Sequence, residues 1–189
     1  MNSVNPDSKE ALQSLLSARG VDTASWGTGT AKAVDDLWAE IEQGEATLQG
    51  DPFRRVVSVV EVLIVQDGRY LLEAEQEFHD GRRRTRDTLP AEKLGVDERP
   101  KEGARRCLME ELALERADIH ELWRRAKYQT TLTESPSYPG LRTEYDITRV
   151  AARVRPLPNT AFWTDESEEA GKEPVRRHRW AWKPLSDPG

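Results

Sequence analysis

The sequence has one cysteine, Cys107, among its 189 residues. An intramolecular disulfide and a multi-cysteine zinc site are therefore excluded, since each needs more than one thiol. The longest nearly apolar run, Val56 to Val65, spans ten residues and is interrupted by Ser58 and Glu61. A membrane-spanning helix needs about 20 apolar residues, so this run predicts a buried strand instead.

The amino-terminal segment, Met1 to Asp7, lacks both a basic start and an apolar core. A secretory signal needs both features and a transit peptide is rich in arginine, so we expect a cytoplasmic protein. The chain carries 28 Lys and Arg against 34 Asp and Glu, a formal net charge of −6. This acidic balance argues against general nucleic-acid binding. We expect neither a specific nucleic-acid partner nor a membrane partner.

Residues 1–50 are predicted to form a helical extension. Two groups of apolar residues recur at the spacing of an amphipathic helix, and each group ends at a glycine. The first group is Ala11, Leu12, Leu15 and Leu16 before Gly20, and the second is Val34, Leu37, Trp38 and Ile41 before Gly44. We expect this extension to pack on the remaining domain or to build a contact in a homodimer.

Residues 51–189 are predicted to form an α/β domain with the order β-β-loop-α-β-β. Asp67-Gly68 is typical of a hairpin turn, and a polar, arginine-dense loop is expected from Glu73 to Asp87. An acidic, solvated loop is expected from Thr164 to Glu173. The predicted strands are Val56 to Val65, Tyr70 to Leu72, Tyr128 to Leu132, Arg142 to Val154 and Trp180 to Trp182, and the predicted helix is Lys101 to Leu114.

Three carboxylates are expected to converge near this helix. On a helical wheel, Glu111 flanks the apolar stripe, Glu110 lies next to it, and Glu98 precedes the helix. Clustered carboxylates repel one another unless a cation separates them, and Mg²⁺ bridges such groups to phosphates. The pattern is therefore compatible with phosphate chemistry. The alternative is that Glu110 and Glu111 are ordinary surface charges on a helix, and the pair alone does not establish a site.

The segment from Leu89 to Leu114 resembles the box of the Nudix family, which runs Gly, five residues, Glu, seven residues, Arg-Glu-apolar-any-Glu-Glu-any-Gly-apolar. The positions that match are Glu98, Arg106, Leu108, Glu110, Glu111 and Leu114. The resemblance covers roughly residues 54–154. It implies a Nudix-type α/β/α sandwich with a mixed sheet, to which residues 1–50 add a helical extension.

The resemblance also implies an activity. It implies a divalent-metal-dependent hydrolase of a diphosphate-containing small molecule similar to a nucleoside diphosphate derivative, with Mg²⁺ or Mn²⁺ as cofactor. Glu111 would be the principal metal ligand and Glu110 the second. Glu98 would be a loop ligand or the base that orients water, and Arg106 would orient a loop carboxylate.

Three residues depart from the box. Glu92 replaces its opening Gly, Ala113 replaces its closing Gly, and Cys107 replaces the Glu of its Arg-Glu pair. A thiol is a poor ligand for Mg²⁺, so the metal site is expected to be weakened. Two interpretations follow. In the first, hydrolysis survives with the remaining carboxylates, aided by Glu92. In the second, the cleft binds a ligand, regulates, or performs a different reaction.

Arg82, Arg84 and Arg86 lie directly before the box and are candidates to bind the phosphates of a substrate, since guanidinium groups bind phosphate oxygens bidentately. A solvated loop balanced by neighbouring carboxylates is the alternative. Tyr138 lies in a turn before a strand and is a candidate to stack on a substrate base, or else a plain turn residue.

Cys107 lies in the middle of the predicted helix, beside its apolar stripe, which favours inert packing over a nucleophilic role. The three histidines, His79, His120 and His178, lack the spacing of metal ligands. We therefore assign them no function from the sequence.

Overall fold

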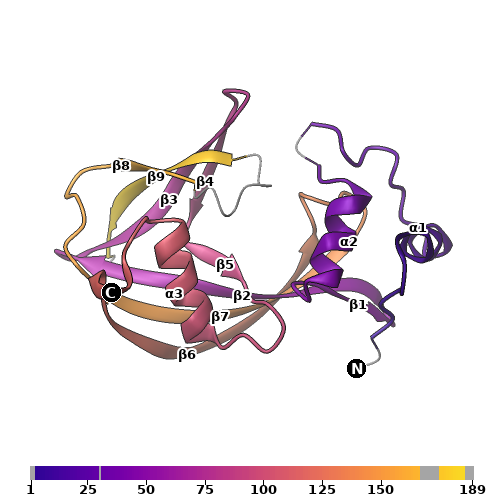
Figure 1. Cartoon of the computed structure of the whole chain (residues 1–189), viewed down its shortest axis with the longest axis horizontal. Helices are drawn as coiled ribbons and strands as arrows, with labels where there is room; N and C mark the ends of the chain where they lie inside the picture. The colour runs from indigo at the N-terminus through magenta and orange to yellow at the C-terminus, as the bar shows by residue number, and fades with distance from the viewer. Residues whose placement is uncertain (1–2, 30, 167–174, 186–189) are drawn as a thin grey trace. The chain divides into compact units, whose positions relative to one another are not determined.

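The computed structural model describes residues 3–29, 31–166 and 175–185 (Figure 1). Within them, no helix is long and apolar enough to cross a membrane. The helices are α1 (Lys9–Ala18), α2 (Val34–Glu42), α3 (Pro100–Glu110) and the 3₁₀ turn η1 (Arg116–Asp118). The strands are β1 (Thr47–Gly50), β2 (Phe53–Gln66), β3 (Arg69–Phe78), β4 (Arg83–Thr88), β5 (Ala91–Lys93), β6 (Ile119–Glu134), β7 (Arg142–Val154), β8 (Phe162–Asp165) and β9 (Val175–Pro184).

The strands are hydrogen-bonded in the order β6-β7-β2-β3-β9-β8, while β1 and β5 pair with β2 and β4 pairs with β3. The predicted α/β class with a mixed sheet is confirmed.

The chain divides into two compact units. The first unit contains Met1–Val59, Lys93–Glu98 and Tyr128–Ile147, and the second contains Val60–Glu92, Arg99–Lys127 and Thr148–Gly189. A domain boundary at residue 50 stays a prediction.

In the first unit, the two predicted helices form and bury their apolar faces. Helix α1 begins at Lys9, and its N-cap is Ser8, whose side-chain oxygen accepts a hydrogen bond from the backbone N–H of Ala11 at 3.2 Å. The shared core consists of Leu12, Leu16, Trp26, Leu37, Ile41, Leu48, Tyr138 and Leu141. The indole Nε1 of Trp26 also donates to the carbonyl oxygen of Pro139 at 2.9 Å. The helical segment is therefore bonded to the turn that precedes β7.

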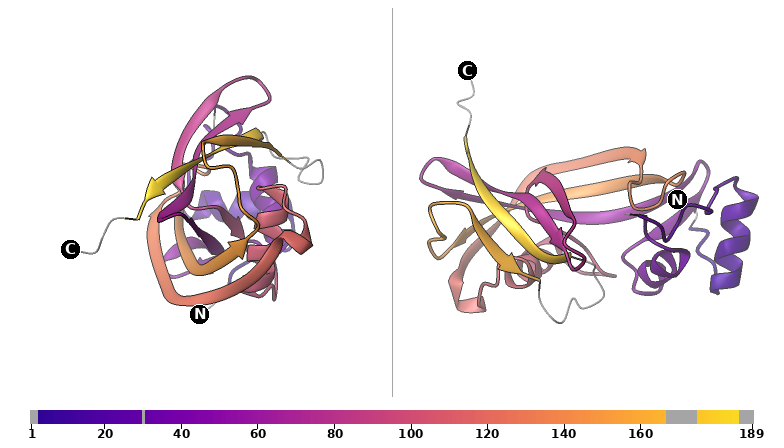
Figure 2. Two further views of the ribbon diagram at one scale, coloured as in Figure 1. Left: turned by 90° about the vertical axis from the view of Figure 1, so that its left-hand side faces the viewer. Right: turned by 90° about the horizontal axis from the view of Figure 1, so that it is seen from above.

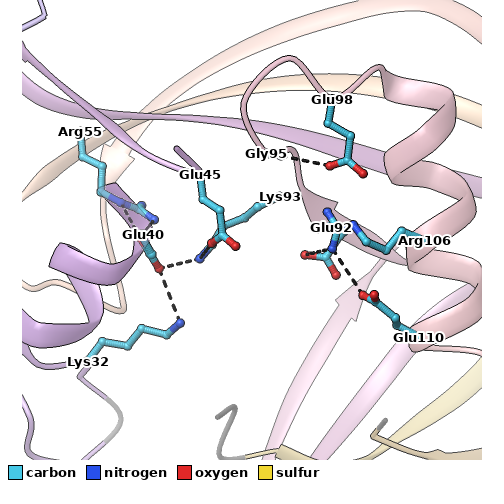
Figure 3. Close-up of polar contacts among 10 residues, drawn as sticks. All are labelled: Lys32, Glu40, Glu45, Arg55, Glu92, Lys93, Gly95, Glu98, Arg106 and Glu110. Atoms are coloured by element: carbon cyan, nitrogen blue, oxygen red, sulfur yellow. Dashed lines mark hydrogen bonds and ion pairs between the residues drawn. The ribbon is translucent and has the colours of Figure 1, made fainter. Parts of the chain in front are cut away.

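A buried carboxylate, Glu40 of α2, organises the charges of the first unit (Figure 3). The Arg55 guanidinium donates to it through Nη2 at 2.5 Å, and the Lys93 ammonium approaches at 2.5 Å. Lys32 adds an ion pair at 3.5 Å. Burial alone would raise the pKa of Glu40, but the three cations outweigh it and hold the pKa below its ordinary value of 4.5.

We expect Glu40→Gln to lower the free energy of unfolding by about 3–5 kcal/mol at pH 7, because it leaves Arg55 buried without its counter-charge. Since the pKa of Glu40 is depressed by folding, its contribution is complete above pH 4.5 and is lost as the pH falls towards the folded pKa. Urea unfolding between pH 3 and pH 7 measures both effects. Glu42→Gln, at an exposed position of the same helix, should change the stability little; equal losses in the two variants would contradict this account.

Gly44 ends α2 with φ of +71°. A Cβ built there would lie 1.8 Å from Cγ2 of Val96, whereas a Cβ on Gly20, with φ of +73°, would meet nothing within 4 Å. Both glycines occupy the left-handed region, but only at Gly44 does a neighbouring side chain fill the space.

We expect both Gly44→Ala and Gly20→Ala to destabilise the protein through backbone strain, by about 1 kcal/mol each. Gly44→Ala should cost a further amount of about 1 kcal/mol, because Val96 must be displaced. Thermal unfolding of the two variants measures the difference. Adding Val96→Ala to Gly44→Ala should recover that difference, and no recovery would refute the proposed clash.

The second unit is built on the long antiparallel pairing of β3 with β9, which runs from Arg69 opposite Pro184 to Phe78 opposite Val175 (Figure 2). Strand β4 pairs with β3, and β8 pairs with β9. Helix α3 buries Ala104, Cys107 and Leu108. The predicted last strand, Trp180 to Trp182, lies within the longer strand β9.

The predicted loop from Glu73 to Asp87 is wrong. Strand β3 continues to Phe78, and β4 returns from Arg83 after a turn at Gly81. The sequence of this stretch is polar because ion pairs connect its two strands. Arg83 of β4 pairs with the carboxylates of Glu75 and Glu77 on β3, at N···O distances of 3.3 and 3.1 Å. Cross-strand ion pairs replace the apolar alternation by which a strand is usually recognised. The predicted acidic loop reaches residues 167–174, outside the described residues, and Thr164 and Asp165 belong to β8.

Helix α3 ends at Glu110, four residues before the predicted end. Glu111 is its C-cap, and Ala113 adopts φ of +50°. Glycine is the residue that takes this left-handed conformation at the end of a helix without strain. Ala113, which stands at the closing-Gly position of the box that the sequence resembles, therefore takes a conformation that favours glycine.

Candidate functional site

Glu111 is the C-cap of α3, and a hydrogen bond to its backbone fixes its position further. Its carbonyl oxygen accepts a hydrogen bond from the Thr164 hydroxyl at 2.5 Å. That hydroxyl in turn accepts from Nε1 of the buried Trp180 at 2.7 Å. The end of the helix is thereby tied to β8 and β9, and the Glu111 carboxylate is directed towards β9.

The side chain that meets Glu111 is His178 of β9, which is 2% exposed. Its Nδ1 lies 3.1 Å from Oε2 of Glu111 and 2.6 Å from Oε1 of Glu73 on β3. Its Nε2 lies 2.5 Å from Oε2 of Glu166, which follows β8. One imidazole therefore contacts three carboxylates. The ring and the three carboxylates come from four different parts of the chain. Ligand atoms of Glu73, Glu111 and His178 all lie within 4.8 Å of one another.

The charges of this cluster are coupled. Burial, together with the carboxylates of Glu166 and Glu73, raises the pKa of Glu111 to about 8, and His178 offsets only part of this. Burial alone would lower the pKa of His178, but hydrogen bonds to Glu166 and Glu73 and the charge of Glu111 raise it to about 10. The pKa of Glu73 is lowered, because His178 and Arg86 outweigh its burial. The carboxylates thus gather around a protonated ring, and the cluster attracts positive charge.

Glu110 lies in a separate group with Arg106 and Glu92 (Figure 3). Nη1 of Arg106 is 3.4 Å from Oε2 of Glu110 and 3.6 Å from Oε1 of Glu92. Glu92, which replaces the opening Gly of the box, is thus an ion-pair partner of the box arginine. A role of Arg106 in orienting a carboxylate stays a prediction, but the guanidinium contacts two of them.

Glu98 belongs to the first unit, whereas Glu110 and Glu111 belong to the second. Its Oε2 accepts a hydrogen bond from the backbone N–H of Gly95 at 3.0 Å, which closes the short loop before α3. The convergence of all three predicted glutamates stays a prediction. Within the second unit, the structure brings Glu111 together with Glu73, Glu166 and His178.

The candidate substrate residues have different surroundings. Arg86 on β4 donates through Nε to Oε2 of Glu73 at 3.0 Å and so contacts the cluster. Arg84 donates through Nε to Gln76 at 3.1 Å, and Arg82 pairs with Asp80 at the hairpin turn at 2.6 Å. Phosphate binding by these three arginines stays a prediction.

Tyr138, the candidate to stack on a substrate base, is buried in the first unit. Its side chain is 0% exposed, its ring centre lies 5.1 Å from that of Trp26, and the Arg55 guanidinium lies 5.1 Å from its centre. Both contacts occupy the ring within the core of the first unit. A substrate-binding role of Tyr138 stays a prediction.

Glu73, Glu166 and His178 were not recognised from the sequence. His178 has no partner at metal-ligand spacing, and Glu73 lies in a stretch interpreted as a loop. A signal was nevertheless present: His178 precedes Trp180 by two residues, so both side chains lie on one face of the strand. A histidine on the core face of a strand needs a polar partner, and its partners come from distant segments.

The residues of the cluster fit a divalent cation. Carboxylate oxygens and an imidazole nitrogen are the donors that such ions take from proteins. Cys107, which stands where the box has a Glu, contributes no ligand while its thiol is protonated. It is fully buried, and burial together with Glu111, Glu92 and Glu110 raises the pKa of its thiol well above the usual range. The thiol therefore stays protonated and inert.

We expect native protein at pH 8 to react with a thiol reagent such as DTNB far more slowly than the urea-unfolded chain, because Cys107 is protonated and enclosed. The absorbance of the released thiolate measures the rate in each state. Rapid stoichiometric labelling of the folded protein would contradict the assignment of Cys107 as an inert packing residue.

No family model matches the chain, and no curated protein matches it. Among solved structures, it is similar to a NUDIX hydrolase from Nitrosomonas europaea, with 17% identity and a TM-score of 0.38 over 67% of this chain and 71% of that one. It is also similar to an ADP compounds hydrolase, with 16% identity and a TM-score of 0.33 over 72% of this chain and 67% of that one. The first bears the name of the family whose box this sequence resembles. At these identities and TM-scores, the likenesses assign no activity to the chain.

Proposed function

We propose that the chain hydrolyses the phosphate anhydride of a phosphorylated small molecule, using a divalent cation at the carboxylate cluster of the second unit. The observation that carries this proposal is the meeting of Glu111, at the end of the box helix, with Glu73 of β3 around His178. Buried carboxylates at this spacing repel one another unless positive charge is supplied, and a divalent cation held by Glu73 and Glu111 would supply it.

The residues have distinct roles in this proposal. Glu111 and Glu73 hold the ion, which, when bound, polarises a phosphate group and lowers the pKa of water. Thr164 fixes the backbone of Glu111, and Arg86 fixes the carboxylate of Glu73. Glu110 remains a candidate second ligand and Glu98 a candidate water-orienting base, as the box resemblance implies.

A binding module without hydrolysis is the second candidate. Two observations favour it: the position of a box glutamate is occupied by the protonated thiol of Cys107, and Glu110 already pairs with Arg106. In that case the cluster would be balanced by the His178 proton alone, and a phosphorylated ligand would be bound without being cleaved.

Glu111→Gln separates the two functions. In a hydrolase it should lower kcat by about 10²-fold or more while the affinity for substrate changes little, because stabilisation by the ion acts chiefly in the transition state. Phosphate or nucleotide release from nucleotide sugars, dinucleoside polyphosphates and non-nucleotide diphosphates measures turnover with and without EDTA.

Glu115→Gln, which changes an exposed carboxylate four residues away, is the matched control and should retain wild-type turnover. Calorimetry with the same compounds measures binding. Undiminished hydrolysis by Glu111→Gln would refute the proposed site. Binding without hydrolysis by the wild-type protein would favour the second candidate.

A further inference from the structure

The donor atoms around His178 indicate which kind of ion the site selects, an inference that rests on the function proposed above. Nδ1 of the ring lies between the carboxylates of Glu73 and Glu111, at 2.6 and 3.1 Å. Nε2 faces the opposite direction, towards Glu166 at 2.5 Å. In the ion-free protein Nδ1 directs its proton towards the space that the other two carboxylates share. A cation bound in that space would displace the Nδ1 proton, while the Nε2 proton stays donated to Glu166. A carboxylate behind a metal-binding histidine fixes the tautomer and the ring in this way.

The ring is also fixed by packing. It stacks on Trp180 with ring centres 5.9 Å apart and an interplanar angle of 20°, and Trp180 is anchored to Thr164. Nδ1 therefore cannot turn away from Glu73 and Glu111 without disturbing β9 and β8. A donor held in this manner is pre-organised for an ion.

Glu73 is brought to the ring by the pairing of β3 with β9, in which it stands opposite Trp180. His178 lies two residues before Trp180, so the side chains of Glu73 and His178 share one face of the sheet. The register of β3 against both β4 and β9 shifts only after Glu73, between Glu73 and Glu75. Glu73 thus supplies a carboxylate beside Glu111 in a protein whose box lacks the carboxylate at position 107.

We propose that Glu73, Glu111 and Nδ1 of His178 form a metal site for a first-row transition ion such as Mn²⁺, in preference to Mg²⁺, and that Glu166 is its positioning residue. Mg²⁺ prefers six oxygen ligands in a near-ideal octahedron, whereas imidazole suits transition ions. A set of two carboxylates and one imidazole nitrogen thus discriminates by donor type. Glu73 and His178 supply, from β3 and β9, the ligands that Cys107 does not.

The test uses the full chain with Mn²⁺ or Mg²⁺ alone as the probe. Isothermal titration calorimetry should show Mn²⁺ binding at least about ten-fold more tightly than Mg²⁺. Electron spin-echo spectroscopy of the Mn²⁺ complex should show modulation by a directly bound ¹⁴N nucleus. Equal affinity for the two ions, or a Mn²⁺ spectrum without nitrogen modulation, would overturn the proposal, and neither measurement needs a variant.

Two variants test the roles of the residues. His178→Gln should abolish the nitrogen modulation and the preference for Mn²⁺, whereas His120→Gln, at an exposed histidine of β6, should keep both. Glu166→Gln should weaken Mn²⁺ binding by about ten-fold while keeping the nitrogen modulation, because it removes the support of the ring and not a ligand. Nitrogen modulation that persists in His178→Gln would refute the assignment of the ring.

These outcomes are separate from those of the hydrolase proposal. Hydrolysis that is lost in Glu111→Gln but supported equally by Mg²⁺ and Mn²⁺ would leave the function standing and remove the proposed selectivity. Hydrolysis that persists in Glu111→Gln would remove the function, while the calorimetric and spectroscopic results would still decide whether His178 binds the ion.

Discussion

The second unit depends on the confinement of three carboxylates around one buried imidazole. Glu73, Glu111 and Glu166 all contact His178, so a single ring separates charges that would otherwise repel one another. Bringing them together costs free energy of desolvation, which hydrogen bonds to the ring offset only in part. The raised pKa of Glu111, about 8, reflects that remaining cost. A site that retains such a cost is typical of function more than of stability.

The surrounding structure serves to hold these groups in place. The pairing of β3 with β9 brings Glu73 and His178 to the same region, and the end of α3 supplies Glu111. Thr164 connects that helix end to Trp180. Charges in the adjoining hairpin pair across β3 and β4, so a strand rich in Arg and Glu is stable beside the cluster.

The first unit shows the opposite use of buried charge. Glu40 is contacted by three cations, Arg55, Lys93 and Lys32, so positive charges outnumber the negative charge at this place. The pKa of Glu40 is therefore lowered, whereas that of Glu111 is raised. An excess of partners stabilises the ionised carboxylate and makes the contact structural. Together with the Trp26–Tyr138 contact, this network explains why the helical segment and the turn before β7 form one core.

Local patterns in the sequence determined the two amino-terminal helices, strand β7 with its bounds, the hairpin turn at Asp67-Gly68 and the box helix, because each depends on neighbours within a few residues. They also singled out Glu111. The sequence alone did not reveal β4, because charge pairs between strands replaced the apolar period, nor the burial of Tyr138. Tertiary structure alone decided that Glu73, Glu166 and His178 join Glu111, because residues 105 positions apart meet only through the pairing of β3 with β9.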